Sequence, residues 1–95
     1  MQLSITTLVW DDENVEHIAR HHVSPTEVEE ICFGPEKVVL RAEKAGRYVV
    51  LGRTEAGRYL TVVITTPHKG RARVITAREM VDKEHRRYAN LKGRS

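Results

Sequence analysis

The chain has 95 residues, a mass of 10.9 kDa and a formal net charge of +3, with 40% hydrophobic and 31% charged residues. This length suits one small domain spanning residues 1–95, and the composition excludes a disordered chain. No apolar run approaches the roughly 20 residues of a membrane-spanning helix, so we expect a cytoplasmic protein without membrane contact. Cys32 is the only cysteine, which excludes an internal disulfide, and we expect it to fill core space.

The charges are distributed unevenly along the chain. Residues 1–45 carry 4 Lys or Arg against 9 Asp or Glu, and residues 46–95 carry 12 against 4, which gives net charges of −5 and +8. This asymmetry indicates that the C-terminal half forms a surface for nucleic acid or an acidic partner, with the acidic half kept away from it. The alternative is a solvated surface that is merely polar.

The N-terminal part predicts a strand followed by two helices. Residues 2–10 are rich in Thr and β-branched side chains and indicate the strand, and Asp11 or Asp12 can cap a helix that runs to about Arg20. The expected inward residues of this helix are Val15, Ile18 and Ala19.

The second helix has a clearer start signal. Ser24 as the cap, Pro25 in the first helical position and Glu27 in the third form a capping box, so the helix should run to about Phe33. Its expected inward residues are Val28, Ile31 and Cys32.

Four short apolar runs follow, separated by turns that end in glycine. The expected strands are 38–40, 48–51, 60–64 and 74–75. The expected turns are 44–46, 55–57 and 68–70. Short connections of this kind predict an antiparallel meander.

The final helix is expected to begin at a second capping box, residues 76–79, and to run to about Asn90. Glu84 then lies in the middle of its inward face, between apolar residues. These are Met80, Val81, Tyr88 and Leu91. A carboxylate there needs a partner, for which Arg53 and Arg73 are candidates, or it lies at a cleft. Alternatively, Glu84 reaches solvent at the edge of the helix.

Several segments of the chain together resemble one known family, the BrnT toxins. They are Trp10-Asp11, Asn14, residues 17–21, Val23-Ser24, residues 51–53, residues 73–78, Lys83-Glu84, Arg86-Arg87 and Tyr88. The run Arg-x-Ile-x-Ala-Arg at 73–78, followed by Glu84 and Tyr88, is the most specific part. The resemblance implies an α+β, RelE-like fold: an N-terminal strand and two helices, an antiparallel four- to five-stranded sheet and a C-terminal helix.

The resemblance also implies a function. BrnT-like proteins are ribosome-independent endoribonucleases of bacterial type II toxin-antitoxin systems. The implied partners are RNA as substrate and a BrnA-like, DNA-binding antitoxin, through which alone the toxin would reach operator DNA. We expect the antitoxin to cover the basic C-terminal half; the alternative places it on the acidic helices around Glu27, Glu29 and Glu30. A second hypothesis is a catalytically weak protein of the same fold that binds RNA or a partner.

The chain departs from the family at one helix end. Where members typically carry Lys-His-Gly, this chain has Arg20, His21 and His22. A left-handed backbone is usual at such a position and is easiest for glycine, so His22 predicts an altered or mildly strained backbone.

RNA cleavage without a metal needs a base, an acid and donors for the negative charge on the reacting phosphate. His21 is the candidate acid or base because imidazole exchanges protons near neutral pH, and Arg53 and Arg78 are the candidate phosphate clamps. Glu84 could orient an arginine or transfer a second proton, and Tyr88 could donate a hydrogen bond. The expected RNA-binding residues are Arg58, Lys69, Arg71 and Arg73.

Each candidate also has a structural interpretation. His21 could interact only with a helix dipole, Arg53 could be a surface residue and Tyr88 a core residue. Trp10 is expected to anchor the first strand to the first helix. His17 and His21 have the spacing of two zinc ligands, but no glutamate follows His17 and no thiolate cluster exists, so we expect no metal and no cofactor.

Overall fold

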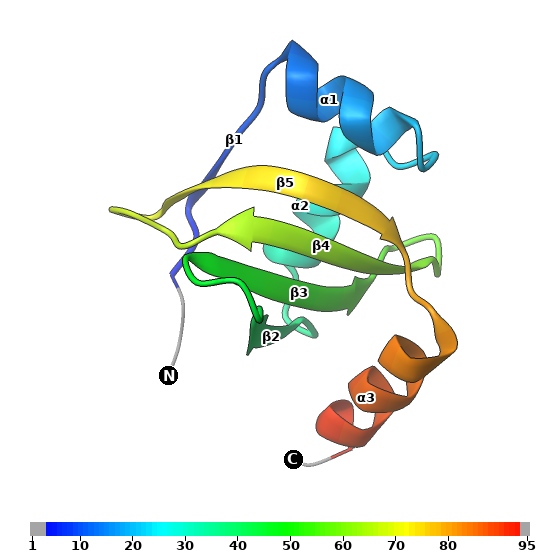
Figure 1. Cartoon of the computed structure of the whole chain (residues 1–95). Helices are drawn as coiled ribbons and strands as arrows, with labels where there is room; N and C mark the ends of the chain where they lie inside the picture. Colours follow the sequence, from blue (N-terminus) through cyan, green and yellow to red (C-terminus); the bar gives the residue numbers. More distant parts are fainter. Residues whose placement is uncertain (1–3, 94–95) are drawn as a thin grey trace.

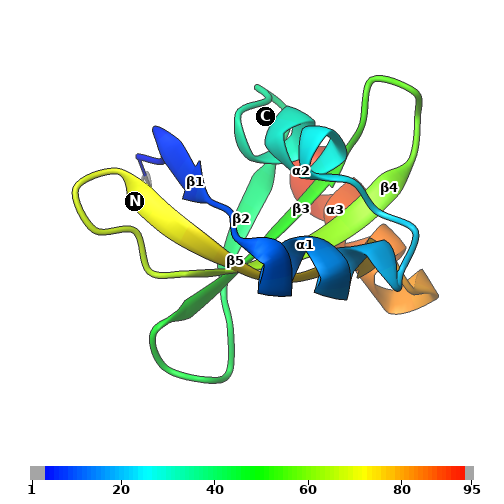
Figure 2. The same cartoon turned by 90° about the horizontal axis from the view of Figure 1, so that it is seen from above.

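The computed structural model describes residues 4–93 as a five-stranded sheet with three helices (Figures 1 and 2). In chain order the elements are β1 (Thr7–Val9), α1 (Asp12–Ala19), α2 (Pro25–Cys32), β2 (Val38–Arg41), β3 (Arg47–Arg53), β4 (Tyr59–Thr65), β5 (Arg71–Glu79) and α3 (Asp82–Lys92). The strand order is β1-β5-β4-β3-β2. Within residues 4–93, no helix is long and apolar enough to cross a membrane.

The sheet is a meander with one added strand. Strands β2 to β5 pair antiparallel in sequence order, which confirms the predicted meander. β1 pairs with β5 in parallel, with Thr7 opposite Arg71 and Val9 opposite Arg73, so the sheet is mixed rather than wholly antiparallel. The strand predicted over 2–10 is shorter than expected, and its residues 2 and 3 lie outside the described part of the chain.

Both N-terminal helices begin as predicted. Asp11 caps α1 by accepting a hydrogen bond from the Asn14 N–H at 3.0 Å, and Ser24 caps α2 in the expected box with Glu27. The inward face of α1 differs from the prediction, because Ala19 is exposed and Asn14 is buried. The Asn14 amide donates to the carbonyls of Val9 and Val74 and thereby ties α1 to β1 and β5.

The two faces of the sheet carry separate apolar clusters. On β3, Val50 belongs to the main core with α1 and α2, whereas the next residue, Leu51, faces α3. The cluster on the α3 face contains Leu51, Met80 and Tyr88, with Val38, Leu40 and Val49 packed around it. In Figure 1, α1 lies above β5 and α3 lies below the strands. The main core is therefore on the side of α1 and α2, and α3 covers only part of the other face.

Cys32 takes its predicted position in the main core, whereas the hydrogen bond of Trp10 is to α2 and not to α1 as predicted. Cys32 is 1% exposed, and burial raises the pKa of its thiol to about 12. Trp10 packs against the same core, and its indole N–H donates to Glu29 at 3.2 Å. Both side chains therefore stabilise the packing of the N-terminal helices.

The predicted start of the last helix is wrong. Thr76 to Glu79 form the end of β5, where Glu79 pairs with Leu60, and α3 begins only at Asp82. This segment is a strand and not a helix because pairing with β4 satisfies its backbone N–H and C=O groups along its whole length. The capping glutamate is instead Glu84, whose carboxylate accepts from the Val81 N–H at 2.9 Å. Val81 is accordingly 54% exposed and does not face the core.

Candidate active site

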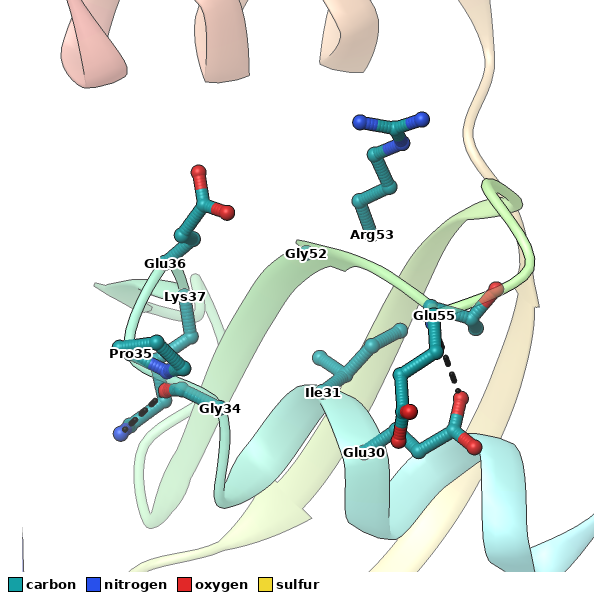
Figure 3. Close-up of a pocket in the computed structure, with 10 residues that line it drawn as sticks. Glu30, Ile31, Gly34, Pro35, Glu36, Lys37, Gly52, Arg53 and Glu55 are labelled. Atoms are coloured by element: carbon teal, nitrogen blue, oxygen red, sulfur yellow. Dashed lines mark hydrogen bonds between the residues drawn. The ribbon is translucent and has the colours of Figure 1, made fainter.

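Arg53 lies on the α3 face of the sheet, and the glycine that precedes it faces α2. A Cβ on Gly52 would lie 2.7 Å from Ile31 Cγ2, so only glycine lets α2 pack this closely against β3. The next side chain then points to the opposite face, and Figure 3 shows Arg53 extending away from α2, at a pocket of about 270 Å³. None of the carboxylates in residues 4–93 forms an ion pair with Arg53.

An aromatic cluster lies beside Arg53. Tyr59 sits directly opposite it on β4, and the Arg53 guanidinium carbon lies 5.7 Å from the centre of the Tyr59 ring. Two side chains of α3 also contact this ring, His85 at 5.1 Å and Tyr88 at 6.1 Å between ring centres. Tyr59 remains 37% exposed, so the cluster is open to solvent.

Arg78 and Glu84 form a two-pronged ion pair on the same face. Arg78 Nη1 donates to Glu84 Oε1 at 2.8 Å, and Nη2 donates to Oε2 at 2.9 Å. The Thr61 hydroxyl also donates to Glu84, at 2.8 Å. The partner of Glu84 is therefore Arg78, and the predicted candidates Arg53 and Arg73 were wrong.

These contacts fix the charge of Glu84. Partial burial raises the pKa of the carboxyl, but the hydrogen bonds from Arg78, Val81 and Thr61, together with the Arg78 charge, outweigh this effect and lower the pKa to about 2. Glu84 is thus a carboxylate at neutral pH. It has no proton to give there and is a weak base.

Arg78 keeps one hydrogen-bonding edge free. Its Nη1 also donates to the Glu79 carbonyl at 3.1 Å, so three of the five guanidinium N–H groups are engaged within residues 4–93. The remaining donors are Nε and the second hydrogen of Nη2, which form the other fork of the guanidinium. A fork of this kind matches two oxygens of a phosphate.

Arg53 and Arg78 lie on the same face of the sheet. Arg53 pairs with Tyr59 and Arg78 with Thr61, so the two arginines are two strands and two residues apart on one face. Strand geometry places their Cα atoms roughly 12 Å apart. We call Arg53 and Arg78 together the arginine site.

Tyr88 connects α3 to the segment before β2. Its hydroxyl donates to the Glu36 carbonyl at 3.0 Å, and Lys92 Nζ lies 2.7 Å from the Glu36 carboxylate. The side chain is 6% exposed. Tyr88 therefore lies next to the arginine site, with its hydroxyl proton already engaged.

The structure does not bring His21 to the other candidates. His21 lies in the turn after α1, on the side of α1 and α2, and its ring contacts His17 at 5.6 Å between centres. His17 Nε2 in turn lies 3.0 Å from the Thr76 hydroxyl. His22 has a φ of 60°, so the backbone at this helix end is left-handed, which is the strained one of the two predicted outcomes.

The predicted RNA-binding residues do not form one track. Lys69 and Arg71 lie exposed at the β4–β5 turn, and Arg71 is seven residues before Arg78 along β5, roughly 23 Å away. Arg58 is engaged by acceptors within the fold. They are Glu27, Glu79 and the His22 carbonyl.

Arg73 is engaged in the same way, by Asp11 and by Glu13. The expectation that the acidic half is kept away from the basic half is therefore wrong. Ion pairs across the two halves neutralise part of the +8 charge inside the fold.

Residues 4–93 contain no group of three or more His, Cys, Asp or Glu placed to hold a metal ion. His17 and His21 are neighbours, but no third ligand lies with them in that part of the chain.

A small α+β domain with two arginine forks on one open sheet face is suited to binding phosphate groups. The chain matches, over residues 10–84, the family described as the ribonuclease toxin, BrnT, of type II toxin-antitoxin systems. The chain belongs to this family. It also resembles the crystal structure of the Brucella abortus ribonuclease toxin BrnT, with a TM-score of 0.64 and 19% identity over 80% of this chain and 97% of that chain. A search of curated proteins found no match.

The structural likeness confirms the α+β fold predicted from the sequence. Sequence reasoning missed Tyr59 and His85 as neighbours of the arginine site. The hairpin turn at 55–57 was a usable signal for Tyr59, since it places Tyr59 opposite Arg53. His85 had no such signal, because its position depends on where α3 begins.

Proposed function

We propose that this protein is an endoribonuclease that cleaves RNA without a metal and independently of the ribosome, at the arginine site. The observation that carries this proposal is the pair of guanidinium groups on one open face: Arg53 has no carboxylate partner in residues 4–93, and Arg78 keeps a free fork. Fixed positive donors of this kind stabilise the charge that develops on a phosphate during cleavage.

Glu84 and Tyr88 support the site without transferring protons. Glu84 holds the guanidinium of Arg78 in one orientation through two hydrogen bonds, which leaves Nε and one hydrogen of Nη2 for a phosphate. Tyr88 holds α3 against the segment before β2 through the Glu36 carbonyl. Both residues are positioning residues in this proposal.

The antitoxin implied by the family has a surface available on the same face. We propose a BrnA-like, DNA-binding antitoxin that covers the arginine site and neutralises the toxin by blocking RNA. Operator DNA would be contacted only through that complex, in the cytoplasm. Several basic side chains of α3 are exposed there and would attract an acidic segment of such a partner. They include Lys83 and Arg87.

The test uses purified protein, a labelled single-stranded RNA and an excess of EDTA. We expect the wild type to cleave under these conditions and Arg53→Ala to be about 100-fold slower, with an unchanged circular dichroism spectrum. Arg86→Ala is the matched control, because residue 86 is on the side of α3 opposite Glu84 and should stay within threefold of the wild type.

Three results contradict the proposal. Loss of cleavage in EDTA with recovery on adding zinc or magnesium contradicts the metal-independent mechanism. Wild-type cleavage by Arg53→Ala removes the arginine site from the reaction, and RNA binding without cleavage by the wild type identifies a binding protein instead.

A further inference from the structure

The arginine site lacks a proton donor if Glu84 and Tyr88 only position other groups. RNA cleavage needs such a donor, because the 5′ oxygen leaves poorly as an alkoxide. Histidine is the side chain that most often supplies a proton near neutral pH. The position of each histidine relative to the sheet therefore decides which one can serve.

Most histidines of the described part of the chain are remote from the arginine site. Those at 17, 21 and 22 belong to α1 and the turn after it, on the other face, and His68 lies at the β4–β5 turn, at the far end of β5 from Arg78. His85 lies on α3, directly after Glu84. Within residues 4–93, His85 is the histidine on the face of the arginine site.

The contacts of His85 place it beside Tyr59, the ring over which Arg53 lies. Its ring meets the Tyr59 ring edge to face, at 5.1 Å and 61°, and the guanidinium of Arg53 also lies against Tyr59. The preceding residue, Glu84, holds Arg78. His85 itself is exposed, so its imidazole is open to solvent on the face that carries both arginines.

We propose that His85 is the catalytic acid of the cleavage step, an inference that rests on the proposed ribonuclease function. The 2′ oxygen attacks phosphorus and its proton passes to water. The bond from phosphorus to the 5′ oxygen breaks, the electron pair stays on that oxygen, and protonated His85 gives it a proton. The products are a 2′,3′-cyclic phosphate and a 5′ hydroxyl, and the imidazole then regains a proton from water.

This assignment goes beyond the family match. The matched segment ends at residue 84, one residue before His85. The role of His85 is therefore argued from the contacts of this chain alone.

The test compares two RNA substrates that differ in the leaving atom. One carries the natural 5′ oxygen, and the other carries sulfur in its place, which leaves as a thiolate without needing a proton. We expect His85→Gln to cleave the oxygen substrate at least about 100-fold more slowly than the wild type and the sulfur substrate within about fivefold of it. His68→Gln is the matched control and should resemble the wild type on both.

Arg53→Ala separates this inference from the function on which it rests. Arg53→Ala should be slow on both substrates, because its charge acts on the phosphate and not on the leaving atom. If His85→Gln is equally slow on both substrates, or cleaves the oxygen substrate within threefold of the wild type, His85 is not the acid although the ribonuclease function stands. If the wild type cleaves neither substrate, both proposals fail.

Discussion

Replacing Glu84 by Gln tests the central ion pair of the site. Glutamine has nearly the same shape, and its amide oxygen can still accept from the Val81 N–H and the Thr61 hydroxyl. It removes the negative charge that faces Arg78 at 2.8 and 2.9 Å. The substitution therefore isolates the charge of Glu84 from its packing and most of its other contacts.

The lowered pKa of Glu84 sets the size of the effect. A change from 4.5 to about 2 corresponds to roughly 3 kcal/mol of stabilisation of the folded state. The Arg78 side chain is 39% exposed, so solvent screens the pair, and we expect a loss of about 2 kcal/mol at pH 7.

The loss of stability caused by Glu84→Gln should become smaller as the pH falls. The folded-state pKa lies below the unfolded value, so the stabilisation is complete above about pH 5 and is lost as the pH falls toward 2. The difference in unfolding free energy between wild type and Glu84→Gln should fall to less than half by pH 3. Other carboxyl groups titrate in both proteins and cancel in this difference.

Urea unfolding followed by the fluorescence of Trp10 at pH 7, 5 and 3 measures the difference. Glu16→Gln is the control, since residue 16 is exposed on α1 and should change stability by less than about 0.5 kcal/mol. A Glu84→Gln difference that stays constant from pH 7 to pH 3 would refute the reasoning, because the loss would then not come from the charge pair.

Three further predictions concern the fold. His22→Gly should stabilise the protein by about 1 kcal/mol in urea unfolding, because glycine adopts the φ of 60° without strain; an unchanged midpoint would show that His22 is not strained. Gly52→Ala should cost about 1–3 kcal/mol in the same assay, because its Cβ would lie 2.7 Å from Ile31 Cγ2. Cys32 should resist iodoacetamide in the native protein and react in urea, as followed by mass spectrometry, because the thiol is 1% exposed with a pKa raised by burial to about 12; rapid native labelling would contradict its burial.

The elements that the sequence predicted well are set by neighbouring residues. Ser24, Pro25 and Glu27 contain the whole start signal of α2 within four positions. The glycines of the three predicted turns have φ values of 81°, 94° and 80°. Glycine adopts such values without strain because it has no Cβ. Such signals need no knowledge of the rest of the fold.

The start of α3 could not be predicted in this way, because residues 76–79 fit two patterns. They match a capping box, but they also continue a β-branched strand, and only the presence of β4 alongside decides for the strand. Because the helix was predicted to start too early, the position of Glu84 within it was also wrong. A glutamate expected in mid-helix is in fact the third residue of α3, where it turns back toward Val81 and Arg78.

The charge asymmetry between the two halves was a poor predictor of the basic surface, because a net charge does not show which side chains form ion pairs. Arg58 and Arg73 counted toward the basic surface, yet both hold acidic residues of the N-terminal half. Arg53 has no such partner in residues 4–93. The proposed RNA-binding surface is therefore defined by the guanidinium without a carboxylate partner in residues 4–93, and not by the net charge.

The candidate site shows why the sequence grouped His21 with the arginines. His21 was grouped with the arginines because its side-chain type suits acid or base catalysis. In the fold, however, α1 and α3 pack on opposite faces of the sheet, so His21 and the arginines are separated. The Glu84 carboxylate both caps the start of α3 and orients Arg78 of β5. The start of α3 then brings His85 to Tyr59. The fold of this helix and the chemistry of the site consequently depend on the same side chain, so that weakening the cap should also disturb the arginine that it holds.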